Sequence, residues 1–178
     1  VSALRVGHPT RIHPTLRRYT IESQMREHPL GSEAQSVRRE LEALFRKQER
    51  ERERSRYTRE EMLRLKDAIA ERKQALRELN RDLESRVLGR TEVFVSTLLG
   101  TESERLSERR FDVVIIDEAA QALEPFAWVA MARAGSVVMA GDHCQLPPLV
   151  RSPEAMRGGL AVTLFERAQC CGSNARNA

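Results

Sequence analysis

The chain has 178 residues, of which 31% are charged and 4% aromatic, so it is long enough to bury a core without disulfide cross-links. Its 30 Lys and Arg residues against 26 Asp and Glu residues give a net charge of +4, a mild basic bias that permits a polyanionic partner without requiring one. Three cysteines form no disulfide framework and no apolar run approaches the ~20 residues of a membrane span, which excludes disulfide-rich secreted and membrane-spanning classes.

The cellular compartment follows from the same features. Reduced thiols and the lack of a signal-peptide pattern predict a cytoplasmic or nuclear protein that is not secreted and has no membrane partner. The sequence opens inside a strand-like pattern without an initiating Met, and we therefore expect it to be part of a longer protein. No feature favours a particular oligomeric state.

The N-terminal segment predicts a strand followed by a loop. Residues 1–6 alternate as a short strand does, and residues 7–9 break it, because Pro disfavours helix for the residue before it. Residues 10–18 then carry three Arg side chains, a His and two Thr hydroxyls. This set suits phosphate contacts and equally suits an ordinary basic surface loop.

Residues 32–86 predict an antiparallel helical hairpin. Gly and Pro are absent there, and Leu residues recur at helical spacing. We expect Ser32 to cap the first helix, and Thr58 with Glu61 to form a capping box at the start of the second. The turn is expected between residues 52 and 58. The pattern leaves the purpose of the hairpin open between a dimerising coiled coil, an arm that grips a polymer and a spacer.

A return to sheet is predicted at residues 92–97, where E-V-F-V-S-T ends in Ser96 and Thr97 and is followed by Gly100 and Thr101. Small hydroxyl residues beside a Gly allow a ligand to approach the backbone closely. An ordinary Ser/Thr turn explains them equally well.

Two adjacent acids follow the next predicted strand. Residues 113–116 are four consecutive β-branched residues, which predict a strand buried on both faces of a parallel sheet. Asp117 and Glu118 come at its carboxyl end, where open α/β sheets bind ligands. The pair fits a metal-and-water site or a solvated acidic turn.

A second strand and a rigid loop complete the pattern. Residues 122–132 predict a helix with Pro in its first turn, and residues 136–140 a buried strand. The loop after it holds Asp142 and Gln145 between a Gly and two Pro residues, which suggests a rigid sensing loop. Residues 160–168 predict a short amphipathic helix, and residues 169–178 a disordered or poorly packed tail.

Three long motifs occur in order: D-V-V-I-I-D-E-A-A-Q, S-V-V-M-A-G-D-H-C-Q-L-P-P and G-G-L-A-V-T-L-F-E-R. Together they resemble superfamily 1 helicases, in particular the 5′-to-3′ branch that includes the nonsense-mediated-decay and immunoglobulin-mu-binding helicases. The segments L-R-V-G-H-P and V-S-T-L-L-G-T resemble two earlier motifs of that branch. The resemblance implies an α/β fold: a partial RecA-like P-loop NTPase domain with a parallel sheet (residues 1–31 and 87–168), interrupted by the inserted antiparallel hairpin or coiled coil (residues 32–86), with the tail at residues 169–178.

The resemblance also implies roles for the polar residues at the strand ends. Asp117 would bind Mg²⁺, directly or through water, and Glu118 would orient and deprotonate the water that attacks the γ-phosphate of ATP. Gln121 would relay the nucleotide state by hydrogen bonding. Gln145 would sense the γ-phosphate, and Asp142 would hold the sensing loop in place.

The expected polymer is single-stranded DNA or RNA, along which ATP hydrolysis would drive a helicase or translocase. The resemblance implies that Ser96, Thr97 and Thr101 touch the nucleic-acid backbone and that His8 and Pro9 lie near the path of the strand. Backbone contacts of this kind position a strand without reading its bases.

Two parts of such a motor are missing from these 178 residues. No G-x-x-x-x-G-K-[ST] segment occurs, so the loop and the Lys that bind the phosphates are absent, and so is the second RecA-like domain with its arginine finger. We therefore expect the chain not to hydrolyse ATP alone, and expect residues 136–140 to form an unpaired edge that favours association. The alternatives are a catalytically dead coiled-coil scaffold and a passive nucleic-acid-binding remnant.

Overall fold

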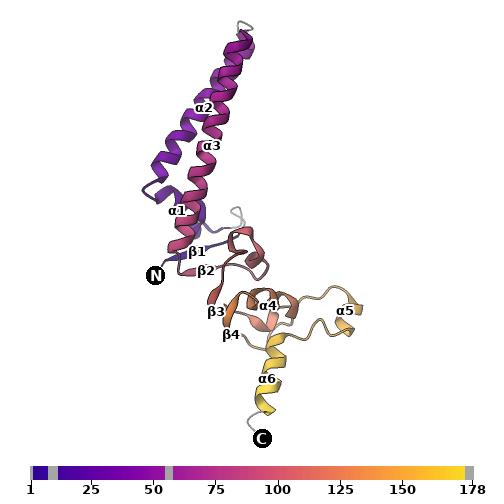
Figure 1. Cartoon of the computed structure of the whole chain (residues 1–178). Helices are drawn as coiled ribbons and strands as arrows, with labels where there is room; N and C mark the ends of the chain where they lie inside the picture. The colour runs from indigo at the N-terminus through magenta and orange to yellow at the C-terminus, as the bar shows by residue number, and fades with distance from the viewer. Residues whose placement is uncertain (1, 8–11, 55–57, 175–178) are drawn as a thin grey trace. The chain divides into compact units, whose positions relative to one another are not determined.

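The computed structural model describes residues 2–7, 12–54 and 58–174. The chain divides into two compact units, Val1–Val95 and Ser96–Ala178. In the described residues each unit contains one two-stranded parallel sheet, β1 with β2 in the first and β3 with β4 in the second (Figure 1). The prediction of an α/β chain with parallel strands is confirmed. Among the same residues, no helix is both long and apolar enough to cross a membrane.

The sheet of the first unit joins segments far apart in the sequence. Strand β1 (Ala3–Arg5) pairs with β2 (Val93–Val95), with Leu4 opposite Phe94. Between them in the chain lie a 3-10 helix (Pro14–Tyr19), α1 (Ile21–Glu27) and the helical hairpin. The hairpin is therefore inserted between two strands that are neighbours in the sheet.

Helices α2 (Gly31–Arg54) and α3 (Arg59–Arg90) lie side by side along their length (Figure 1). An ion pair of 3.1 Å joins Arg72 of α3 to Glu40 of α2, and Leu65 and Ile69 of the apolar stripe are buried. The capping box is present: the Thr58 hydroxyl accepts from the Glu61 N–H at 3.2 Å, while the Thr58 N–H donates to the Glu61 carboxylate at 3.0 Å.

The start of α2 differs from the prediction. The helix begins at Gly31, and Ser32 lies in its first turn and donates its hydroxyl to the Pro29 carbonyl at 3.2 Å instead of capping an N–H group. A Cβ at Gly31 would stand 2.5 Å from the carbonyl oxygens of Met25 and Arg26. Only Gly permits this contact with the end of α1, so packing between helices, and not a cap, fixes the start of α2.

The far end of α3 also extends beyond the prediction. The helix continues through residue 86 to Arg90, since Val87 and Leu88 extend its buried stripe. Thr91 ends the helix by donating its hydroxyl to the Val87 carbonyl at 2.7 Å. Strand β2 therefore starts soon after the helix ends.

The second unit carries β3 (Phe111–Ile116) and β4 (Ala134–Met139), paired with Val114 opposite Val137 and Ile116 opposite Met139. One face of this sheet packs on a core made by Ile116, Ala119, Ala120, Ala127 and Phe165. On the other face Ile115 is 71% exposed and Val138 is 51% exposed. The prediction that residues 113–116 are buried on both faces is wrong, because nothing among the described residues covers that face.

Helices α4 (Glu124–Met131) and α6 (Leu164–Asn174) and the 3-10 turn Ala119–Gln121 contribute residues to this core. Helix α5 (Pro153–Arg157) contributes none, and two further 3-10 turns lie at Leu99–Glu102 and Glu104–Leu106. Helix α4 has Pro125 in its first turn, as predicted.

Helix α6 differs from its prediction at both ends. It starts at Leu164 because buried Thr163 and Glu166 form a reciprocal cap, with bonds of 3.0 and 3.2 Å between their side chains and backbone N–H groups. It continues through residue 169 to Asn174, so the expectation of disorder fails for residues 169–174. Helical periodicity carried by small and polar residues is weak, which hid the second half of this helix.

Candidate functional site

The two acids occupy a strained turn at the carboxyl end of β3. The backbone of Glu118 is left-handed, with φ of 54° and ψ of 40°, and its N–H donates to the Asp117 carboxylate at 3.0 Å. A left-handed conformation is uncommon for any residue with a long side chain. Both acidic side chains are exposed. The turn therefore presents two carboxylates to solvent from adjacent positions.

Contacts with the end of β4 hold this turn. The Ala119 N–H donates to the Ala140 carbonyl at 2.8 Å, and the Ala140 N–H donates to the Ile116 carbonyl at 2.9 Å. A Cβ at Gly141 would lie 2.9 Å from the Ala120 nitrogen and 3.1 Å from that of Ala119. Gly141 therefore permits the start of the loop after β4 to lie this close to the acidic turn, because any Cβ there would crowd these two nitrogens.

The loop after β4 is organised by Asp142. One of its carboxylate oxygens accepts from the Cys144 N–H at 2.9 Å, and the other accepts from the Gln145 side-chain amide at 3.1 Å. These two hydrogen bonds, with a smaller contribution from the charge of His143, hold the pKa of Asp142 below its usual value. The side chain thus links residues 142–145 into one small loop.

Gln121 contacts the acidic turn directly. Its side-chain amide donates to the Glu118 carboxylate at 3.1 Å, from the 3-10 turn that starts with two buried Ala residues. The structure therefore brings Asp117, Glu118 and Gln121 together, with the loop of Asp142 and Gln145 held against the same turn through Gly141.

The hydroxyl residues after β2 make local contacts. The Ser96 hydroxyl donates to the Thr97 carbonyl at 2.9 Å, the Thr97 hydroxyl accepts from the Gly100 N–H at 3.1 Å, and the Thr101 hydroxyl donates to the Leu98 carbonyl at 2.5 Å. These are the bonds of a Ser/Thr turn. Their predicted role in nucleic-acid binding stays a prediction, and His8 and Pro9 lie outside the described residues.

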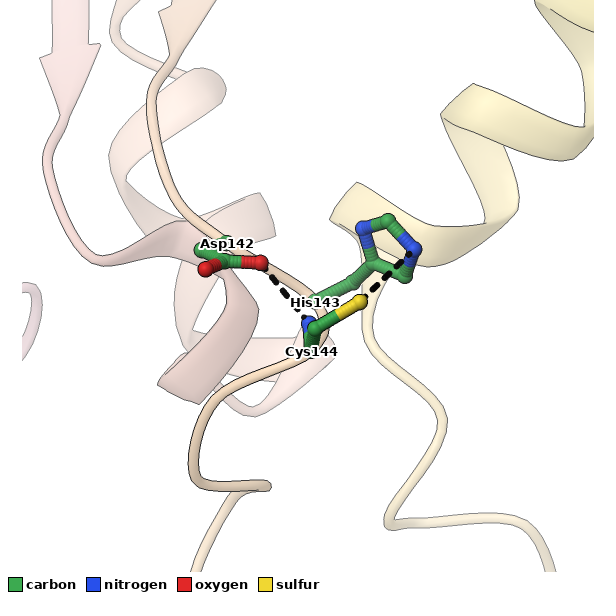
Figure 2. Close-up of side chains that lie close together, drawn as sticks. All are labelled: Asp142, His143 and Cys144. Carbon is green, nitrogen blue, oxygen red and sulfur yellow. Dashed lines mark hydrogen bonds between the residues drawn. The ribbon is translucent and has the colours of Figure 1, made fainter.

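The loop after β4 also contains an imidazole and a thiol, the side chains of His143 and Cys144, which the sequence pattern did not single out. The His143 ring nitrogen Nε2 lies 3.6 Å from the Cys144 sulfur, beside the Asp142 carboxylate (Figure 2). Cysteine spacing gives no signal for this cluster, since the partner of the thiol is a His next to it in the chain. The sequence signal that could have found it is a His directly followed by a Cys within a loop predicted to be rigid.

Residues 1–153 match a family described as an AAA domain. The chain belongs to this family. It is 32% identical over 171 residues to the DNA-binding protein SMUBP-2 of Rattus norvegicus, covering 92% of this chain and 16% of that protein. It is 29% identical over 171 residues to the DNA polymerase alpha-associated DNA helicase A of Schizosaccharomyces pombe, covering 94% of this chain and 24% of that protein.

A further relative of this AAA-domain chain is the regulator of nonsense transcripts 1 homolog of Drosophila melanogaster, 38% identical over 97 residues, which are 54% of this chain and 8% of that protein. The resemblance to superfamily 1 helicases read from the motifs is therefore confirmed. The chain spans 16% and 24% of the first two of these relatives, so it corresponds to a small part of their length.

Proposed function

We propose that this AAA-domain chain is part of an ATP-dependent helicase or translocase that couples ATP hydrolysis to movement on single-stranded DNA or RNA. The observation that carries the proposal is the contact through Gly141, which holds the Asp117–Glu118 turn against the loop of Asp142 and Gln145 at the carboxyl ends of two parallel strands. Ligands of open α/β sheets bind at that edge. Relatives named as helicases support the same activity.

The donor set fits a magnesium nucleotide. The exposed Asp117 carboxylate offers the oxygen ligands that Mg²⁺ prefers, and we assign the metal to it. Bound Mg²⁺ would neutralise charge on the ATP phosphates. Glu118 would orient the attacking water and accept its proton, and the bond from Gln121 would keep that carboxylate in place. Gln145, held by Asp142, would contact the γ-phosphate.

The nucleic acid would meet the turn after β2. Ser96, Thr97 and Thr101 place three hydroxyl groups around Gly100, and hydroxyl groups and backbone N–H groups are ordinary partners of phosphate oxygens. We also assign His8 and Pro9 to nucleic-acid binding, on the motif alone. Contacts of this type would give affinity for a strand without base specificity.

The phosphate cradle would come from elsewhere in a longer protein. The 178 residues supply the acids and the sensing Gln but contain no G-x-x-x-x-G-K-[ST] segment. We propose that another segment provides this loop and that a second RecA-like domain completes the ATP site. This proposal also includes the domain organisation: residues 1–31 and 87–168 form a partial motor domain, and residues 32–86 are an insertion in it.

A single substitution tests the function. In the longer protein, Glu118→Gln should lower the rate of ATP hydrolysis by about 10²–10⁴-fold, because the amide cannot accept the proton of the water, while binding of a fluorescent ATP analogue is retained. Glu108→Gln, an exposed acid of the same unit, is the matched control and should hydrolyse ATP at the parental rate.

Three outcomes would each contradict part of the proposal. Unchanged hydrolysis in Glu118→Gln would remove the water-activating role. Strand affinity that falls with salt but shows no ATP response and no hydrolysis in the longer protein would indicate the passive binding remnant instead. Helicase-like turnover by the 178-residue chain alone would refute the need for a separate phosphate cradle.

A further inference from the structure

The loop after β4 places three different ligating groups on consecutive residues. These are the carboxylate of Asp142, the imidazole of His143 and the thiol of Cys144, and all three side chains are exposed. One ligand atom from each lies within 4.8 Å of the others. Figure 2 shows the imidazole and the thiol side by side, with the carboxylate facing the backbone of Cys144.

The spacing of the imidazole and the thiol matches that of two ligands on one zinc ion. The His143 Nε2 atom lies 3.6 Å from the Cys144 sulfur. Zinc bonds of about 2.3 Å to sulfur and about 2.0 Å to nitrogen, at a tetrahedral angle, separate the two donor atoms by about 3.5 Å. The two donor atoms therefore already lie at the separation that a common ion requires.

Asp142 can complete a three-residue set without giving up its loop contacts. Each of its carboxylate oxygens accepts one hydrogen bond, from the Cys144 N–H or from the Gln145 amide. A carboxylate oxygen has two lone pairs, so each oxygen keeps one for a metal. The bond to the Cys144 N–H also fixes the backbone of one ligand relative to the carboxylate, and such contacts orient metal ligands.

We propose that Asp142, His143 and Cys144 form a zinc-binding site on this loop, with the fourth position open to water. A thiolate with an imidazole favours a borderline-soft ion such as Zn²⁺, whereas the oxygen donors of Asp117 and Glu118 favour Mg²⁺. When the ion binds, the Zn–S bond forms as the Cys144 thiol releases its proton to solvent. Zn²⁺ and Mg²⁺ would thus bind at different sites, because the ligands of the two sites differ in softness.

Zinc at this site would act on the neighbouring Gln145. Tying residues 142–144 to one ion restrains the loop in which Gln145 donates to Asp142, and would hinder its adjustment to a nucleotide. This consequence for ATP hydrolysis rests on the proposed function, whereas the binding of the metal does not. The test below therefore measures metal binding directly.

Cobalt serves as a spectroscopic probe for zinc in the reduced chain. One equivalent of Co²⁺ should give the near-ultraviolet charge-transfer band of a cobalt–thiolate bond, and Zn²⁺ should displace it. Cys144→Ser should abolish the band and weaken Zn²⁺ binding at least tenfold; His143→Asn should weaken Zn²⁺ binding by about tenfold or more. Cys170→Ser, which removes an exposed thiol on α6, should leave both measurements unchanged.

Circular dichroism of each variant shows whether the fold is kept. We expect no change, since the three substituted side chains, those of His143, Cys144 and Cys170, are exposed. A Zn²⁺ affinity that is equal in the parent chain and in Cys144→Ser overturns the proposal, as does the absence of a thiolate band in the parent chain. Loss of the band in Cys170→Ser with retention in Cys144→Ser would assign the metal to the C-terminal helix and would overturn it as well.

Discussion

At the scale of single residues, Glu118 carries both the proposed chemistry and a cost in stability. Its backbone is left-handed, with φ of 54°. A residue with a Cβ adopts this backbone conformation at a cost of about 1–2 kcal/mol. Bonds from the Ala119 N–H to Ala140 and from the Gln121 amide to the Glu118 carboxylate hold the turn in this state. The position thus retains an acid where Gly would fit with less strain.

Glu118→Gly should therefore raise the free energy of unfolding of the second unit by about 1 kcal/mol, because Gly adopts this backbone without strain, while removing the water-activating carboxylate. Urea denaturation followed by fluorescence of Trp128, the one Trp of the chain, measures the change. Glu118→Ala is the matched control: it loses the carboxylate but keeps the strain, and should not be stabilised. Equal stability of the Gly and Ala variants would show that the turn stores no strain.

At the scale of elements, reciprocal caps determine where the helices start. Thr58 with Glu61 begins α3, and Thr163 with Glu166 begins α6 by the same pair of bonds. In α3 the two hydrogen bonds from Thr58 also hold the pKa of Glu61 below its usual value. A carboxyl whose pKa is lowered on folding stabilises the folded state above its unfolded pKa, and this stabilisation is lost as the pH falls through the folded pKa.

Thr58→Ala should destabilise the hairpin by about 1 kcal/mol, because it leaves the Glu61 N–H without its side-chain acceptor. Thermal unfolding followed by far-ultraviolet circular dichroism measures the loss. Ser32→Ala is the control and should have a smaller effect, since Ser32 caps no N–H group. The difference between parent and Thr58→Ala should shrink as the pH falls through the lowered pKa of folded Glu61, because its carboxylate is then protonated. A difference independent of pH would contradict the reciprocal cap.

At the scale of the whole molecule, the second unit has a sheet with one covered face. Ile116 and its neighbours pack on the core, whereas Ile115, Val138 and Val113 are 71%, 51% and 49% exposed on the opposite face. Each strand of a two-stranded sheet also has one unpaired edge. Exposed apolar strands with open edges are sites of association.

We therefore expect the 178-residue chain to self-associate with increasing concentration, and Ile115→Lys to reduce that association by placing a charge on the exposed face. Sedimentation velocity over a range of concentrations measures the effect. Leu63→Lys is the matched control, because Leu63 is 58% exposed but stands on a helix, α3, and not in a sheet. A monodisperse monomer at high concentration, or an equal effect of both variants, would contradict the prediction.

The positions of the strands along the chain, the capping box of α3 and the family of the chain could be predicted from sequence. Each depends on residues close together in the chain: the apolar runs before Asp117 and Asp142, the reciprocal pair Thr58 and Glu61, and the motifs themselves. Such local patterns fix hydrogen bonds within a few residues, so they can be recognised without knowing the fold.

Only the tertiary structure decided which faces are covered and which loops touch. The β-branched run 113–116 predicts burial on both faces, but one face of β3 is exposed, because burial depends on neighbouring elements and not on the strand itself. Likewise, the start of α2 is set by the close contact of Gly31 with α1, and the meeting of the acidic turn with the sensing loop depends on Gly141. These contacts join different secondary-structure elements, and the pattern within one element does not show which other element it touches.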